Sequence, residues 1–197
     1  MWSGVQVTTP PAPASLPIEI DVMKLRLRCD EDEENTVITD MIRQAVDRID
    51  GPDGIGVAMM TQTWTRTLDA FSAEIRLPGS PIQSVSEIRY MDCAGDWQVL
   101  AAATYRLCKS THPCIVVPAP GAHFPTTLRG RAVIEIDYVL GNALAADVPA
   151  DLVAAVTLLV GHYFENREAV VTGTIATELP MGVERILARH ARIGAVA

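Results

Sequence analysis

The stretch TQTWTRTL, residues 61–68, alternates without a break and indicates a β-strand. Threonine occupies the odd positions, while Gln62, Trp64, Arg66 and Leu68 share the opposite face. A second stretch, VIEIDYV, residues 133–139, alternates in the same way. Both stretches therefore predict antiparallel strands that have one buried face and one wet face.

Short strand patterns fill the chain between these two stretches. They are AEIRLPG, VSEIRYMD, DWQVL, TYRLC and CIVVPA, and clusters of turn residues around Gly79, Gly95 and Gly121 separate them. Residues 57–141 are therefore expected to form a β-rich region.

Helical patterns flank this region on both sides. Apolar residues recur at three- and four-residue spacing over residues 37–49, which predicts an amphipathic helix preceded by an acidic run at residues 30–34. Residues 18–27 fit a short helix, although they also alternate like a strand. After the β-rich region, Pro149 marks the start of a largely apolar helix that is expected to end near Glu168, and residues 181–192 can form a last helix.

This order of segments predicts an α+β fold. The expected architecture is a helical bundle, made of the N-terminal and C-terminal helices, which is interrupted by an antiparallel β insertion. The helical core is assigned to residues 18–56 and 142–192, and the β-rich insertion to residues 57–141. Residues 1–17, rich in proline, are expected to form an extended N-terminal arm that lacks order in a lone subunit and lies along a neighbour in an assembly, and residues 193–197 form a C-terminal tail.

The charge and hydropathy of the chain exclude several partners. The 197 residues include 16 basic and 24 acidic side chains, for a net charge of −8. A surface of this charge does not favour binding to DNA phosphates or to anionic lipids. The longest apolar run, residues 152–161, is about half of the ~20 residues that a membrane span requires. We therefore expect a soluble protein without a signal peptide, made in a cytosol.

The stretch HYFENREAVV, residues 162–171, is the strongest candidate for a chemical site. His162 and Glu165 lie one helical turn apart, but a di-iron bundle site needs Glu-x-x-His on two helices, and this H-x-x-E is reversed and single. A structural interpretation fits better: aromatic side chains that pack and charged side chains that pair with neighbouring elements or subunits. This predicted subunit interface comprises Tyr163, Phe164, Glu165, Arg167 and Glu168.

No other motif predicts chemistry. Cys108, His112 and Cys114 could share a metal, but a structural zinc site needs four ligands at familiar spacings. The sequence contains no G-x-S-x-G, no P-loop and no G-x-G-x-x-G. No catalytic, cofactor-binding or metal-binding residues are therefore expected, and the chain is not expected to be an enzyme.

Several of these stretches, taken in order, resemble one protein family. They are IEIDVMKLRLRCDEDEEN before ITDMIRQAVDRID, then TQTWTRTLDAF and IRLPGSPIQSVSEIRYMDCAGDWQVL, and above all VPADLVAAVTLLVGHYFENREAVV followed by ELPMGVERIL. The chain resembles the head–tail connector (adaptor) proteins of long-tailed phages and phage-like gene transfer agents. The resemblance covers about residues 16–187.

This resemblance implies structural work at the head–tail junction of a particle assembled in a bacterial cytoplasm. Such proteins form a ring beneath the portal, usually with twelvefold symmetry, which extends the DNA channel and gives the tail a docking surface. The implied partners are the portal protein, neighbouring adaptor subunits in a dodecameric ring, and a tail stopper or terminator protein. DNA would pass through the channel without specific binding, and no membrane is involved.

By analogy with related connectors, we expect the C-terminal segment to reach the portal. It combines basic or titratable side chains with a small apolar tail that can become ordered on binding. The candidate portal-interface residues are Arg185, Arg189, His190, Arg192, Ile193 and Val196. Two alternatives stay open: a tail terminator or stopper protein of the same particle, and a small soluble enzyme with a site in the β-rich region.

Overall fold

The computed structural model describes residues 4–166 and 181–191. The α-helices in these ranges are α1 (Ile20–Leu27), α2 (Asn35–Ile49), α3 (Ala150–Glu165) and α4 (Met181–His190). The short 3-10 helices are η1 (Asp32–Glu34), η2 (Ala102–Thr104) and η3 (Ala145–Asp147). The strands are β1 (Val5–Thr9), β2 (Gln62–Leu68), β3 (Ile75–Leu77), β4 (Ile82–Met91), β5 (Trp97–Val99), β6 (Tyr105–Cys108), β7 (Cys114–Pro118) and β8 (Ile134–Leu140).

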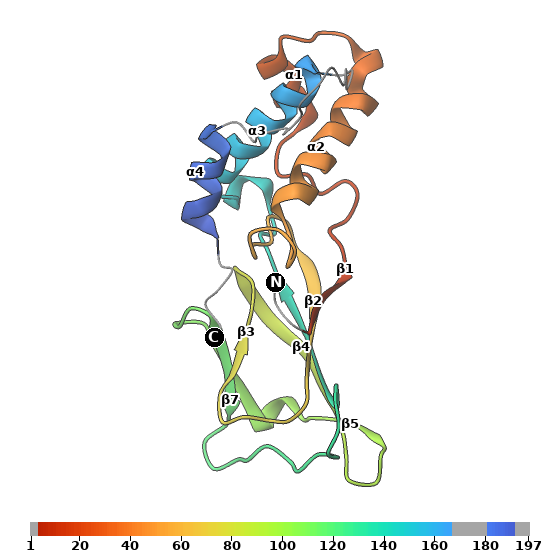
Figure 1. The fold of residues 1–197 in the computed structure, drawn as a ribbon, viewed down its shortest axis with the longest axis vertical. Helices are drawn as coiled ribbons and strands as arrows, with labels where there is room; N and C mark the ends of the chain where they lie inside the picture. The colour runs from red at the N-terminus through yellow and green to blue at the C-terminus, as the bar shows by residue number, and fades with distance from the viewer. Residues whose placement is uncertain (1–3, 167–180, 192–197) are drawn as a thin grey trace, which may run out of the picture.

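The helices and the strands occupy opposite ends of an elongated molecule (Figure 1). The strands form a five-stranded antiparallel sheet in the order β1-β2-β8-β4-β5 and a three-stranded sheet in the order β3-β7-β6. The two stretches that alternate most clearly in the sequence are direct neighbours, because β2 and β8 pair from Gln62 opposite Leu140 to Leu68 opposite Ile134.

The two sheets enclose a core of their own, which we call the sheet core. Trp64 and Tyr138 on the large sheet pack with Leu77 and Val116 on the small sheet, and all four side chains are fully buried. The Trp64 and Tyr138 rings meet edge to face at 6.4 Å. Trp64 and Tyr138 lie opposite each other on β2 and β8, so the predicted alternation placed this inner face correctly.

A second core, the helical core, lies at the other end. Its centre is the α2 stripe of Ile38, Ile42, Ala45 and Ile49, each fully buried. This confirms the amphipathic helix predicted there. The stripe packs on α3, and apolar side chains from α1, α4 and residues 55–60 complete the core. No helix within the described ranges is long and apolar enough to cross a membrane.

The predicted fold class, a helical bundle interrupted by an antiparallel β insertion, is wrong. The fold is instead a mixed α+β arrangement with four helices and two antiparallel sheets in the described residues. The helices are only 8 to 16 residues long and cannot bury their apolar faces on one another alone, so the extended residues 55–60 enter their core. The strands also do not all lie between the helices in sequence, since β1 precedes α1 and pairs with β2.

The N-terminal arm lies along its own chain. Strand β1 pairs with β2, and the Thr67 amide donates a hydrogen bond of 2.7 Å to the Gly4 carbonyl. Gly4 has a φ of +73°, and a Cβ there would lie 2.8 Å from the Thr67 carbonyl oxygen, so both backbone and space favour glycine. The arm was expected to lack order in a lone subunit; the structure places it at the sheet edge. The predicted division of the chain at residues 57 and 142 stays a prediction.

A partly buried carboxylate lies where the two ends meet. Asp50, directly after α2, accepts hydrogen bonds from the amides of Gly51 and Met59 at 2.7 and 3.3 Å and from the Gln62 side chain at 3.0 Å. The side-chain oxygen of Gln62 in turn accepts a hydrogen bond of 2.8 Å from the indole N–H of Trp64. A continuous chain of hydrogen bonds thus joins the end of α2 to the sheet core. Burial raises the pKa of Asp50 to about 6.

Candidate assembly surfaces

Helix α4 carries the described part of the predicted portal interface. Val183 is fully buried in the helical core, while Arg185 points to solvent on the polar side of the helix. Arg189 and His190 both approach one carboxylate, because their nitrogens lie 3.0 and 3.6 Å from Asp151 in the first turn of α3. These two side chains therefore link α4 to α3, although Arg189 is exposed like Arg185.

The other candidate portal residues, Arg192, Ile193 and Val196, lie outside the described residues. The assignment of all six to a portal interface therefore stays a prediction.

The end of α3 carries the predicted subunit interface. Tyr163 and Phe164 are half-buried and pack on the helical core, and Glu165 is exposed. Asn166 caps the end of the helix, since its side-chain amide donates a hydrogen bond of 2.8 Å to the His162 carbonyl. Arg167 and Glu168 lie outside the described residues. The aromatic residues thus contribute first to their own subunit, and their role between subunits stays a prediction.

Metal chemistry gains no support from the side chains that the structure places. The part of the chain that the structure describes holds no cluster of three His, Cys, Asp or Glu side chains arranged for a metal. The His162 ring lies beside Tyr163 and within 3.3 Å of the Asn166 amide, and no cluster forms around it.

The outer face of the large sheet holds an ionic cluster that the sequence did not single out. Arg89 lies 3.3 Å from Glu87, 2.8 Å from Glu135 and 3.1 Å from Asp137. The alternation of residues 133–139 already placed Glu135 and Asp137 on one face, but only the register of β4 against β8 brings Arg89 between them. With three carboxylates around one guanidinium, the formal charge of the cluster is 1 − 3 = −2.

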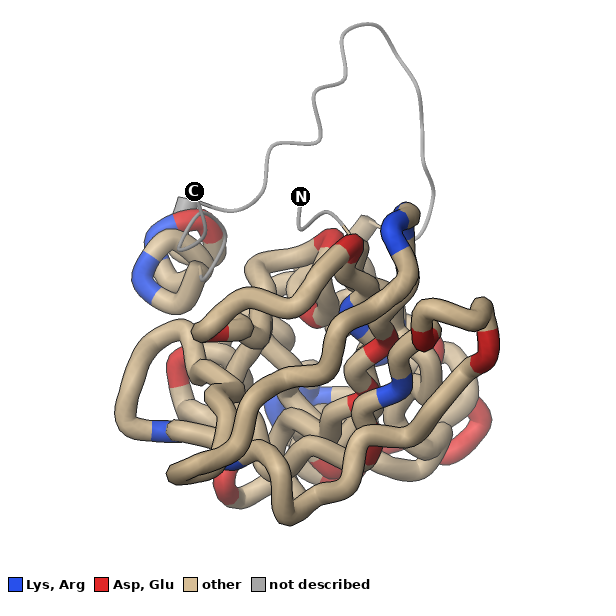
Figure 2. Tube along the Cα trace, turned by 90° about the horizontal axis from the view of Figure 1, so that it is seen from below, with Lys and Arg blue, Asp and Glu red and all other residues tan. Residues whose placement is uncertain are grey.

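The sheet end of the molecule also exposes large apolar side chains. Trp97 and Val99 on β5 are 46% and 63% exposed, and Leu128 on the loop between β7 and β8 is 37% exposed. Seen from below in Figure 2, the Lys and Arg positions of the described chain are scattered among the Asp and Glu positions. The sheet end is therefore suited to protein contacts better than to holding nucleic acid.

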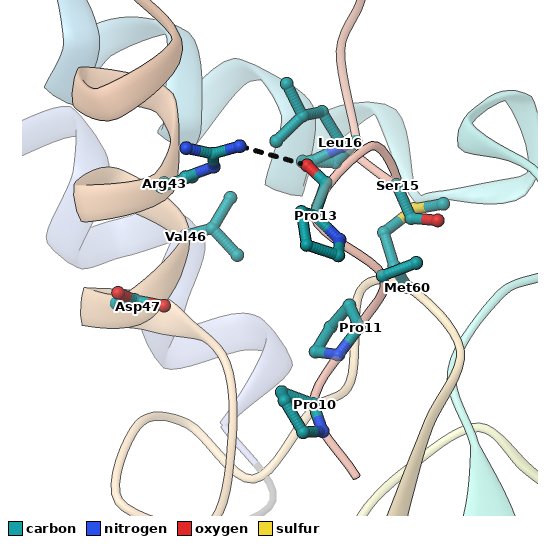
Figure 3. Close-up of a pocket in the computed structure, with 11 residues that line it drawn as sticks. Pro10, Pro11, Pro13, Ser15, Leu16, Arg43, Val46, Asp47 and Met60 are labelled. Atoms are coloured by element: carbon teal, nitrogen blue, oxygen red, sulfur yellow. Dashed lines mark hydrogen bonds between the residues drawn. The ribbon is translucent and has the colours of Figure 1, made fainter.

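A groove of about 360 Å³ runs between α2 and the proline-rich residues 10–17 (Figure 3). Val46 and Met60 line it together with several prolines, and Arg43 donates a hydrogen bond of 3.3 Å to the Pro13 carbonyl. The lining is mostly apolar, with Ser15, Arg43 and Asp47 as its polar side chains. Its contacts hold the arm against the helical end.

Comparisons with known proteins point to one kind of particle. No family model matches the sequence, and no curated protein matches it. The fold is similar to a chain in a structure described as "Virion of native gene transfer agent (GTA) particle", with a TM-score of 0.75 and 24% identity over 98% of this chain and 97% of that chain.

Two further structures describe the neck of such particles. One is "Neck of native GTA particle computed with C12 symmetry", with a TM-score of 0.70 and 25% identity over 98% of this chain and 97% of that chain. The other is "Neck of empty GTA particle computed with C6 symmetry", with a TM-score of 0.69 and 26% identity over 92% and 94% of the two chains. These matches confirm the predicted resemblance to head–tail connector proteins and the predicted place at the neck of a phage-like particle. They favour a structural role over the enzyme alternative.

Proposed function

We propose that this chain is an adaptor that forms a ring beneath the portal, extends the DNA channel and offers the tail a docking surface. The observation that carries the proposal is the extent of the match to a chain of the twelvefold neck, which covers 98% of this chain and 97% of that one. A match over both whole chains favours a shared role over a shared module. Rings of identical subunits use the same head-to-tail contact at every step.

The exposed face of α3 supports the assignment of the ring contact. Leu158 is 46% exposed, and His162 and Glu165 follow on the same face one and two turns later. A large apolar side chain beside polar groups suits an interface between subunits. We assign this face, with Tyr163 and Phe164 beside it, to the contact between neighbouring subunits.

The portal contact is assigned to the exposed side of α4 and the chain that follows it. Arg185 points outward, and Arg189 is 73% exposed although it pairs with Asp151. Both guanidinium groups can therefore reach carboxylates of another protein. The apolar residues that follow them in sequence can add a hydrophobic anchor.

The acidic balance of the chain fits a channel that DNA must leave easily. A net charge of −8 per chain, repeated around a ring, repels phosphate and lowers the residence time of DNA at the wall. Passage without specific binding follows from this charge.

Co-sedimentation with the purified portal ring of the same particle tests the proposal. We expect about one chain to bind per portal subunit. Replacing Arg185→Glu and deleting residues 192–197 should abolish binding while the thermal unfolding midpoint stays within a few degrees. Arg76→Glu, an equally charge-reversing change at the exposed position of β3, is the matched control and should bind normally. A folded chain that never binds the portal would contradict the proposal.

A further inference from the structure

We propose that the outer hairpin, formed by β4, β5 and the turn at residues 92–96, binds the next neck component on the tail side through Trp97 and Val99. Its partner would present an apolar recess bordered by basic side chains. This inference rests on the proposed function, which assigns the helical end to the portal. The sheet end, which lies opposite in Figure 1, is then left to face the tail.

The outer hairpin presents its apolar residues on one continuous face. Trp97 lies opposite Met91 and Val99 opposite Arg89, and such cross-strand partners point to the same side of a sheet. The backbone of Leu128 lies beside the hairpin, because its amide donates a hydrogen bond of 3.0 Å to the Met91 carbonyl. Trp97 and Val99 therefore form one apolar face next to the ionic cluster of Arg89.

The turn of the hairpin is held rigidly without help from another chain. The Asp92 carboxylate accepts hydrogen bonds from the amides of Ala94 and Asp96 at 2.9 and 3.1 Å and from the Gln98 side chain at 2.9 Å. The Asp96 amide above all, and then the Gln98 side chain, hold the pKa of Asp92 below its usual range. A hairpin fixed in advance loses little conformational entropy when it binds, which favours a docking role.

Strand β5 itself contributes no buried side chain to the sheet core. All three of its residues are exposed, and the sheet core is closed by other strands. Tryptophan is among the residues that most often dominate binding energy at protein interfaces. An exposed tryptophan on a rigid hairpin therefore indicates a contact surface.

The negative charge around the outer hairpin favours a partner with basic side chains. The cluster around Arg89 has a formal charge of −2, and Asp92 and Asp96 add further negative charge at the turn. A second copy of this chain, at −8, is disfavoured there by like charge, whereas a surface bordered by Lys or Arg is attracted. The apolar patch fits a recess between such basic residues.

Particles assembled with variant chains test this inference. We expect Trp97→Ala with Val99→Lys to leave DNA-filled heads with a normal amount of this chain, but to lower the fraction of tailed particles in electron micrographs by roughly 30-fold, as for the loss of one dominant interface side chain. Leu144→Lys is the matched control, because Leu144 is 64% exposed against 63% for Val99. It should leave tail attachment unchanged.

A second measurement tests the charge. Isolated tailless heads that carry this chain are mixed with purified tails at increasing NaCl concentration. Asp96→Lys should slow attachment about threefold at low salt and weaken its dependence on salt.

Tails attached at the normal frequency to heads with the double variant would overturn the inference. So would a folded double variant that is missing from heads, because the hairpin would then join copies of this chain or the portal. Heads that lack even the unchanged chain would instead overturn the proposed function, and the inference with it.

Discussion

The helical end and the sheet end differ in how completely they bury their apolar side chains. The sheet core is closed by paired strands, and the exposed large apolar side chains around the two sheets are Val7 on β1, Trp97 and Val99 on β5, and Leu128. The helical end leaves large apolar side chains in solvent on three of its helices. They are Val22 and Leu25 on α1, Val37 on α2 and Leu158 on α3.

This difference separates stability from assembly. Paired strands satisfy one another's backbone hydrogen bonds and bury one face within a few short segments. The sheet end therefore encloses a core of its own and exposes apolar side chains mainly on its edge strands β1 and β5. Short helices cover one another only in part, so the helical end retains apolar surface that other subunits can cover. The sheet core should therefore determine the stability of the subunit, and the helical end most of its contacts in a ring.

The largest expected effect on stability comes from a substitution in the sheet core. Trp64→Ala removes a fully buried side chain and the indole that donates to Gln62, so we expect the free energy of unfolding in urea to fall by about 4 kcal/mol. Trp97→Ala removes the same kind of side chain from a 46% exposed position and should change the free energy of unfolding by less than about 0.5 kcal/mol. Similar losses for both variants would mean that the sheet core does not dominate stability.

The next effect lies at the junction and depends on pH. The pKa of Asp50 is about 6 in the folded chain and near 3.8 when unfolded, so the folded state holds this proton more tightly. Stability from this group is complete below about pH 4 and is lost as the pH rises to about 6. The loss is at most about 3 kcal/mol, from 1.36 kcal/mol per pKa unit.

Chemical denaturation of the unchanged chain and Asp50→Asn between pH 4 and 7 measures this effect. Other carboxylates titrate alike in both proteins, so the difference in unfolding free energy isolates Asp50. As the pH rises, we expect the unfolding free energy of the unchanged chain to fall relative to that of Asp50→Asn. Parallel curves would show that the three donors around Asp50 offset its burial.

The smallest expected effect concerns the ion pairs that link α4 to α3 at the helical end. Asp151→Asn removes the charge that faces Arg189 and His190, and these exposed partners predict a loss of only about 0.5 kcal/mol. The local consequence should be larger, since amide hydrogens of α4 should exchange faster. Asp147→Asn, in η3 just before α3, is the control and should leave α4 unchanged.

Local patterns were predictable, and long-range pairing was not. The periodicity of residues 37–49 and of residues 61–68 gave α2 and β2 with their buried faces. The short helix at residues 18–27 could not be separated from a strand, because the short segment fits both periods; the structure forms α1 there. The first strand was hidden, since the prolines that follow it favoured an arm, and its pairing with β2 spans more than fifty residues.

The assembly surfaces show the same limit. The basic side chains of α4 were visible in the sequence, but their shared partner Asp151 lies near the start of another helix. The DWQVL segment was recognised as a strand, yet only its position at the edge of the sheet leaves Trp97 in solvent. Such features depend on register and on packing between distant segments, which local periodicity does not encode.

The direction of the strands has a mechanical consequence. Strands β2, β4 and β8 run along the long axis of the molecule, and within the described ranges the chain passes between the two ends before α1, after α2 and before α3 (Figure 1). A load along this axis therefore acts on several covalent crossings in parallel and shears the interstrand hydrogen bonds together. A sideways load is resisted by the contacts at the junction, which include the hydrogen bonds of Asp50 and those between Asn142 and Met59. The subunit should behave as a strut that is stiff in tension and compression and that bends at its middle.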